Sequence, residues 1–174
     1  MHRIIPFSFI FVLLGCVRQS DETKAGKFDE EIVNLANPNA DSNYTRLRAL
    51  TTLTVGVSCG EEPSVTENVH LVGELAGQGK FDLLLSLVQT DSKNATTQML
   101  TILVLNIAWD LNKNNLDTSL RKSINSMPII ATFEWCMGCL SEFKTYQDYE
   151  SLSKEGLAAY QELKDYFTAK INKE

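Results

Sequence analysis

The stretch that decides the fold is PIIATFEWCMGCLSEFKTY, residues 128–146. Its apolar residues recur at steps of four and three, the spacing of one helix face: Ile129, Phe133, Cys136, Leu140 and Phe143. Pro128 suits the first turn of a helix, where its missing N–H would have no partner in any case. The spacing therefore predicts a helix over these residues.

A strand is the alternative for the first part of this stretch. Ile, Thr, Phe and Trp, which all favour strands, follow one another in IIATFEW, residues 129–135. Gly138 is unfavourable inside a helix, and a break there would place Cys139 at a helix start. We favour the helix.

Outward from this stretch, apolar residues recur at helical spacing from about Asp41 to the end of the chain. Ser64 and Glu67 form a capping-box signature at the start of one expected helix. Residues 95–111, ATTQMLTILVLNIAWDL, are apolar nearly all round and predict a central buried helix. The predicted fold class is all-α, either a small helical bundle or a short stack of helix hairpins. The first helix is expected to carry one face made of Tyr44, Leu47, Leu50, Thr54 and Val57.

The segment LLLSLVQTDSKNATTQMLTILVLNIAW, residues 83–109, resembles one armadillo or HEAT repeat unit. Such units place a short helix, a turn with an acidic residue and a longer helix ending in L-x-N-I-A. The resemblance implies a right-handed stack of helix hairpins that binds a partner. An irregular helical bundle is the alternative.

The chain starts MHRIIPFSFIFVLLGC, residues 1–16, with Arg3 before an apolar run from Ile4 to Leu14. The run is shorter than the roughly 20 apolar residues that span a bilayer, and the pattern is that of a secretory signal. Leu13-Leu14-Gly15-Cys16 resembles the bacterial lipobox. The resemblance implies cleavage before Cys16 and lipid attachment to its sulfur. Two or more acyl chains would then anchor the protein stably to the membrane.

These observations divide the chain into three parts. Residues 1–15 are the expected signal peptide, 16–40 the lipidated cysteine with a polar tether, and 41–174 a helical domain. The formal net charge of −6 argues against nucleic acid as a partner. The expected location is the bacterial cell envelope, with the outer membrane facing the periplasm favoured over the inner membrane.

The motif Trp135-Cys136-Met137-Gly138-Cys139 resembles a thioredoxin active site. That family needs a stabilised thiolate at a helix start, followed by a helix, a cis-proline loop and a further strand hairpin. Residues 140–174 contain no proline and are expected to be helical. We therefore predict that the motif is not a catalytic redox site.

The cysteines are expected to have a structural role. Lipidation of Cys16 leaves Cys59, Cys136 and Cys139, which allow one disulfide in an oxidising compartment. Any pair of the three could form it, and buried free thiols are the second interpretation. A Cys₃His zinc site with His70 is the weaker alternative, so no metal or other cofactor is predicted.

Hydrolytic catalysis lacks the usual residues. His70 is the only histidine after residue 15, and no G-x-S-x-G motif is present. The sequence thus predicts a non-enzymatic, membrane-anchored lipoprotein that binds a protein partner, for example an immunity or inhibitor protein. The alternative is an envelope thiol–disulfide or metal-handling protein that uses Cys136 and Cys139.

Overall fold

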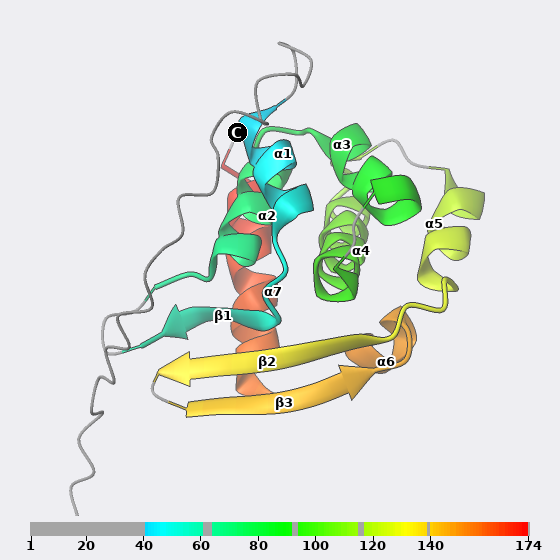
Figure 1. Ribbon diagram of the computed structural model, residues 1–174. Helices are drawn as coiled ribbons and strands as arrows, with labels where there is room; N and C mark the ends of the chain where they lie inside the picture. Colours follow the sequence, from blue (N-terminus) through cyan, green and yellow to red (C-terminus); the bar gives the residue numbers. More distant parts are fainter. Residues whose placement is uncertain (1–40, 61–63, 92–93, 115–116, 139, 174) are drawn as a thin grey trace, which may run out of the picture. The chain divides into compact units, whose positions relative to one another are not determined.

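The computed structural model describes residues 41–173 apart from 61–63, 92–93, 115–116 and 139 (Figure 1). The chain divides into two units, Met1–Leu35 and Ala36–Glu174. All described residues belong to the second unit, so the predicted signal peptide, lipobox and tether lie outside them. The elements, in chain order, are α1 (Ser42–Ala49), β1 (Thr54–Cys59), α2 (Glu67–Gly77), α3 (Phe81–Ser86), a π-helical turn η2 (Leu87–Asp91), α4 (Ala95–Asp110), α5 (Thr118–Asn125), β2 (Ala131–Gly138), β3 (Leu140–Tyr146), α6 (Tyr149–Ser153) and α7 (Ala158–Ile171).

The stretch 128–146 is a β-hairpin, so the prediction of a helix there was wrong. Burial alternates along β2, with Ala131, Phe133 and Trp135 buried and the residues between them partly exposed. Gly138 adopts a φ of 58°, which a glycine reaches without steric cost and which turns the chain into β3. Period-two alternation and strand-forming side chains outweighed the three-and-four spacing, so the strand interpretation of IIATFEW is the one confirmed.

The first predicted helix was also too long. α1 ends at Ala49, the backbone of the next residue, Leu50, is extended, and β1 begins at Thr54. The segment 51–57, TTLTVGV, is rich in β-branched residues, which are stiff in helices and pack well in sheets. The capping box was wrong too. Thr66 is the N-cap of α2, and the Ser64 hydroxyl donates instead to the carbonyl of Cys59 at 2.9 Å.

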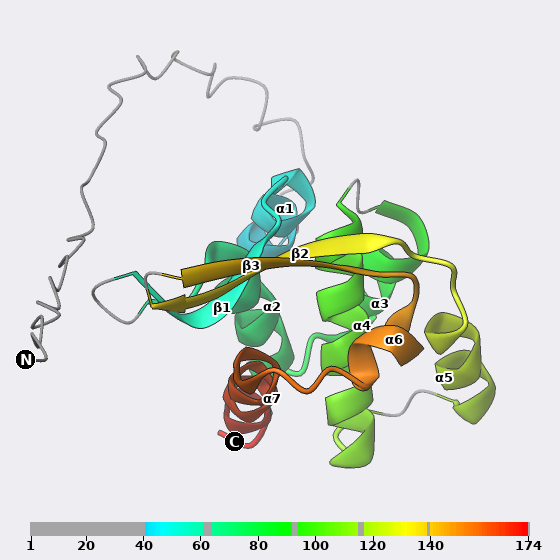
Figure 2. The same cartoon turned by 90° about the horizontal axis from the view of Figure 1, so that it is seen from below.

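The strands form one mixed sheet in the order β1-β2-β3, and this sheet overturns the all-α prediction. β1 pairs with β2 in parallel, with Thr54 opposite Glu134, and β2 pairs with β3 antiparallel, with Ala131 opposite Tyr146. The helices α4 and α7 lie on one side of the sheet, as the edge-on view shows (Figure 2). The described unit is therefore a helical layer packed on one face of a three-stranded sheet.

The core lies between the sheet and α2, α4 and α7. The prediction that residues 95–111 form a buried helix is confirmed, because α4 is buried along almost its whole length. Three aromatic side chains of the sheet, Phe133, Trp135 and Tyr146, pack on one another at tilted and edge-to-face angles beneath the helices.

The expected stack of helix hairpins was wrong as an architecture. Residues 83–109 do contain a short helix, a turn and a long helix, formed by α3, η2 and α4. No second hairpin of this kind stacks on them in the described part of the chain, where α4 packs against β2 and α7. A local helix pair is compatible with many folds, so it carried no information about the sheet.

Candidate functional site

A disulfide joins Cys59 at the end of β1 to Cys136 in β2, with Cα atoms 5.4 Å apart. Parallel pairing makes this contact, since Cys59 lies opposite Gly138 in the next strand. The bond links residues 77 positions apart. Cys139 lies outside the described residues.

This arrangement differs from the geometry that thiol–disulfide catalysis uses. Cys136 lies inside β2 and not at the start of a helix, so no helix dipole is available there to stabilise a thiolate. His70 of the considered zinc set is exposed on α2. Within the described ranges, no three His, Cys, Asp or Glu side chains are grouped closely enough to hold a metal ion.

The face of the sheet opposite the helices is the first candidate site. Side chains alternate across a strand, so the residues of β2 between the buried ones point to this outer face. They include Thr132 and Glu134, which lie opposite Thr145 and Phe143 of β3. Thr54 donates to the Glu134 carboxylate at 2.6 Å, and the hydroxyls of Thr132 and Thr145 are 3.0 Å apart. The polar groups of this outer face therefore bond to one another.

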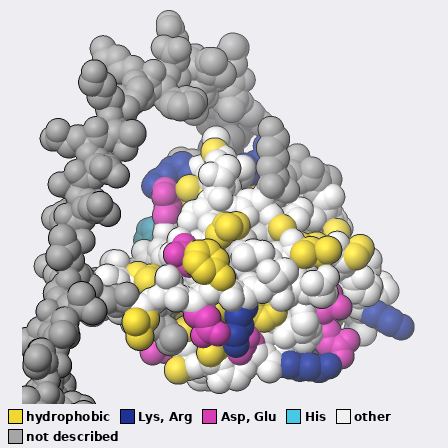
Figure 3. Space-filling view, turned by 60° about the horizontal axis from the view of Figure 1, so that its bottom comes forward, with side chains coloured by type: hydrophobic (Ala, Val, Ile, Leu, Met, Phe, Trp, Pro, Cys, Tyr) yellow, Lys and Arg dark blue, Asp and Glu magenta, His cyan; other side chains and the backbone are white. Residues whose placement is uncertain are grey.

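Apolar side chains stand exposed on and beside this sheet. Among the described residues, the exposed large hydrophobic side chains are Leu53 (42% exposed), Ile130 (63%), Leu140 (73%) and Phe143 (63%). Strand alternation places Ile130 and Phe143 on the outer face with Glu134, whereas Leu140 lies at the turn end of the hairpin. Figure 3 looks towards this side, where hydrophobic side chains lie among polar and charged ones. We call Ile130 and Phe143 the hairpin patch.

A buried network holds the hairpin in place from the inner side. The Trp135 indole donates to the Tyr146 hydroxyl at 2.8 Å, and that hydroxyl donates to Glu155 at 2.6 Å. The Lys144 ammonium lies 3.1 Å from the same carboxylate. Burial raises the pKa of Glu155, but the hydrogen bonds from Tyr146 and Lys144 outweigh it, so the pKa lies below its usual value. Glu155 is therefore a charged anchor, and the hairpin patch sits on a fixed frame.

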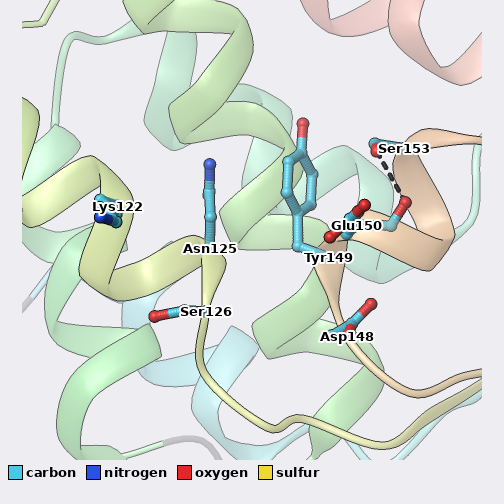
Figure 4. A pocket seen from close by; sticks show the side chains of 7 residues that line it. All are labelled: Lys122, Asn125, Ser126, Asp148, Tyr149, Glu150 and Ser153. Carbon is cyan, nitrogen blue, oxygen red and sulfur yellow. Dashed lines mark hydrogen bonds between the residues drawn. The ribbon is translucent and has the colours of Figure 1, made fainter.

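A cavity between α5 and α6 is the second candidate site, with a volume of about 540 Å³. Its walls come from two separate segments of the sequence (Figure 4). The α5 wall carries Lys122. The α6 wall carries the carboxylates of Asp148 and Glu150, with Tyr149 between them in the sequence. The lining residues are Lys122, Asn125, Ser126, Asp148, Tyr149, Glu150 and Ser153.

The α5 wall of this cavity is held by polar contacts to α4. The amides of Asn125 and the buried Asn106 bond to each other in both directions, at 2.7 and 3.1 Å. Arg121 donates to Asn106 at 2.8 Å and pairs with Asp110 at 2.7 Å. Because Ile124 is the only buried residue of α5, these contacts position the helix.

On the opposite wall, Tyr149 is partly buried and makes no hydrogen bond through its hydroxyl to any described residue. Burial, with the nearby Tyr160 and Asp110, raises the pKa of the Tyr149 phenol above its usual value. The hydroxyl therefore stays protonated at neutral pH and can donate to a ligand.

Sequence reasoning missed both candidate sites. The hairpin patch was hidden by the prediction of a helix, which turned Phe143 inward. The cavity is built from common polar residues without a motif. The one available signal was the polarity of residues 117–125, DTSLRKSIN, because a short helix with so few apolar residues needs polar contacts to hold it.

In the part of the chain that the structure describes, no helix combines the length and the apolar character that crossing a membrane requires. No protein-family model, curated protein or solved structure matches this chain.

Proposed function

We propose that this protein is a lipid-anchored, non-enzymatic binding module of the bacterial cell envelope, and that the hairpin patch contacts its protein partner. The lipobox-like Leu13-Leu14-Gly15-Cys16 supports the anchor. The observation that carries the binding role is the exposure of the hairpin patch on a rigid hairpin.

The composition of the hairpin patch suits a protein partner. Exposed apolar side chains surrounded by polar ones are typical of protein interfaces, which have an apolar centre and a polar rim. The threonines and Glu134 beside Phe143 already bond to one another, so contact would leave few polar groups unsatisfied. Aromatic residues such as Phe143 are also enriched at protein interfaces.

The net charge narrows the kind of partner. At −6 the chain attracts basic proteins and accelerates their association, while it repels nucleic acid. We therefore propose a basic protein that presents an apolar surface to the hairpin patch. An immunity or inhibitor role against a basic toxin or lytic enzyme is one form of this function.

The test is site-specific photo-crosslinking in intact cells, followed by binding measurements. A photoreactive amino acid replaces Phe143 in one strain and Glu162, an exposed residue of α7, in the other. We expect a discrete adduct from position 143 only. The adduct partner, once identified by mass spectrometry and purified, should bind Phe143→Ser at least about tenfold more weakly than wild type, as loss of a central interface side chain predicts.

The matched control is Glu162→Ser, which should bind with wild-type affinity. Equal affinity of Phe143→Ser and wild type would contradict the proposed contact. An adduct with the mass of two copies of this chain would also contradict it, because the hairpin patch would then join identical subunits.

A further inference from the structure

We infer that the cavity between α5 and α6 binds a short zwitterionic peptide, with the peptide carboxylate at Lys122 and its ammonium group at Asp148. This site is separate from the hairpin patch and rests on different observations. Its volume of about 540 Å³ falls within the range of roughly 300–1,000 Å³ typical of small-molecule pockets.

The charges of the two walls carry the inference. Lys122 lies on α5, and Asp148 directly precedes α6. Both line the cavity, yet neither forms an ion pair with any described residue. One oxygen of Asp148 accepts from the Ser151 backbone at 2.8 Å, and the other has no hydrogen-bond partner in the described structure. Lys122 is exposed and Asp148 is partly buried, so both can be reached by a ligand, and one with opposite charges at its two ends would pair with both at once.

The remaining charged group in the cavity is already used. Glu150 pairs with Lys154 at 2.6 Å on the exposed side of α6. Among the lining residues this leaves one cation and one anion, which matches a single zwitterion better than a simple anion or cation.

Two further lining residues can contact a peptide. The side chains of Asn125, from the α5 wall, and Tyr149, from the α6 wall, lie between Lys122 and the carboxylates of the α6 wall (Figure 4). Asn125 is fixed by Asn106, so it forms a rigid floor. The ring of Tyr149 offers an apolar surface, and its hydroxyl can donate to a peptide carbonyl.

The test uses fluorine NMR on the full chain labelled with 3-fluorotyrosine. The chain has five tyrosines, so five signals are expected. The signal that is missing from the spectrum of Tyr149→Phe belongs to Tyr149. The probes are tri-alanine, N-acetyl-tri-alanine and tri-alanine amide. We expect tri-alanine to shift the Tyr149 signal saturably, and each blocked peptide to bind at least about tenfold more weakly, because each loses one charge-assisted contact.

Variants locate the site. Lys122→Met removes the charge and keeps the side-chain stem, and Asp148→Asn keeps an N-cap for α6. Each should weaken tri-alanine binding about tenfold or more. Lys113→Met, at an exposed lysine outside the cavity, should bind as wild type does. Undisturbed signals of the other four tyrosines without peptide show that the variants fold.

Two results would overturn the inference. One is equal binding of N-acetyl-tri-alanine and tri-alanine, which would mark the cavity as an anion site at Lys122. The other is no shift of the Tyr149 signal at about 10 mM tri-alanine, a concentration that would half-saturate even a very weak complex.

Discussion

At the residue scale, Gly56 shows how closely the two parallel strands approach. A Cβ atom at this position would lie 2.5 Å from the carbonyl oxygen of Cys136 and 2.8 Å from the sulfur of Cys59. We expect Gly56→Ala to lower the free energy of unfolding by about 1–3 kcal/mol, the usual cost of overpacking. Urea unfolding of the variant and of wild type measures this difference in the free energy of unfolding.

The matched control for that prediction is Gly156→Ala, in the loop before α7. A Cβ atom added there would meet no other atom within 4 Å, and the backbone φ of Gly156 is not left-handed. This change should leave stability unaltered or raise it by less than about 1 kcal/mol through the unfolded state. Equal destabilisation by both changes would show that Gly56 is not tightly packed.

Also at the residue scale, the lowered pKa of Glu155 predicts that its contacts with the hairpin weaken in acid. Burial raises its pKa, but the hydrogen bonds from Tyr146 and Lys144 bring the folded-state pKa below the usual value of a glutamate. A lowered folded pKa gives stability that is fully present above the unfolded value and is lost as pH falls through the folded value. Stability should therefore fall as the pH drops below about 4.3, the value of an unperturbed glutamate.

The Glu155→Gln variant tests this assignment. The substitution should lower the free energy of unfolding by about 2 kcal/mol at pH 7, because a buried charged acceptor is lost. The stability of the variant should also depend less on pH between about 3 and 5 than that of wild type. Unfolding curves across this pH range provide the measurement. The control is Glu162→Gln on the exposed face of α7, and parallel pH profiles for wild type and Glu155→Gln would exclude the anchor.

At the element scale, the β1–β2 disulfide predicts a large stability difference between the oxidised and reduced protein. Its loop of 77 positions corresponds to roughly 4 kcal/mol in the chain-entropy account. Urea unfolding with and without reductant should show a loss of about 2–5 kcal/mol. Cys59→Ser should lose the same amount without reductant, whereas Cys139→Ser should keep the cross-link.

Peptide mapping under non-reducing conditions identifies the pair directly. A Cys59–Cys136 peptide is the expected product. A Cys136–Cys139 peptide would instead restore the thioredoxin-like interpretation of the motif, and it would remove the only covalent link between β1 and β2 in the described part of the chain.

The same elements show how far the sequence predicts this fold. α4 was predictable because a sixteen-residue segment with apolar residues on all sides has few alternatives to a buried helix. The hairpin was not, because Ile129, Phe133, Cys136, Leu140 and Phe143 satisfy a helical spacing by coincidence while alternate residues satisfy a strand. Only tertiary packing of Phe133 and Trp135 under α4 and α7 decides between the two.

The candidate sites were less predictable than the elements. To predict the hairpin patch, one must know which face of β3 the helices cover. This depends on the register of β3 with β2. The cavity depends on how α5 and α6 approach in space, which no local pattern encodes. The cysteines were visible as a group, but the choice between three pairings depended on the parallel pairing of β1 with β2.

At the scale of the whole molecule, the proposed anchor and the proposed contact surface are separated along the chain. Cys16 lies near the start, and the hairpin patch begins at Ile130. The sequence between them includes the proposed tether, to which the polar residues 17–27 belong. A tether of this kind would raise the local concentration of the binding domain at the membrane.

The lipid anchor itself gives the last prediction. The apolar run from Ile4 to Leu14 is shorter than the roughly 20 residues that cross a bilayer, so lasting attachment requires acyl chains. We expect wild type to incorporate a labelled fatty acid and to sediment with membranes, and Cys16→Ser to incorporate none. Cys139→Ser is the matched control and should label as wild type does. Equal labelling of wild type and Cys16→Ser would refute the anchor, and any binding by the hairpin patch would then belong to a protein held in place by other means.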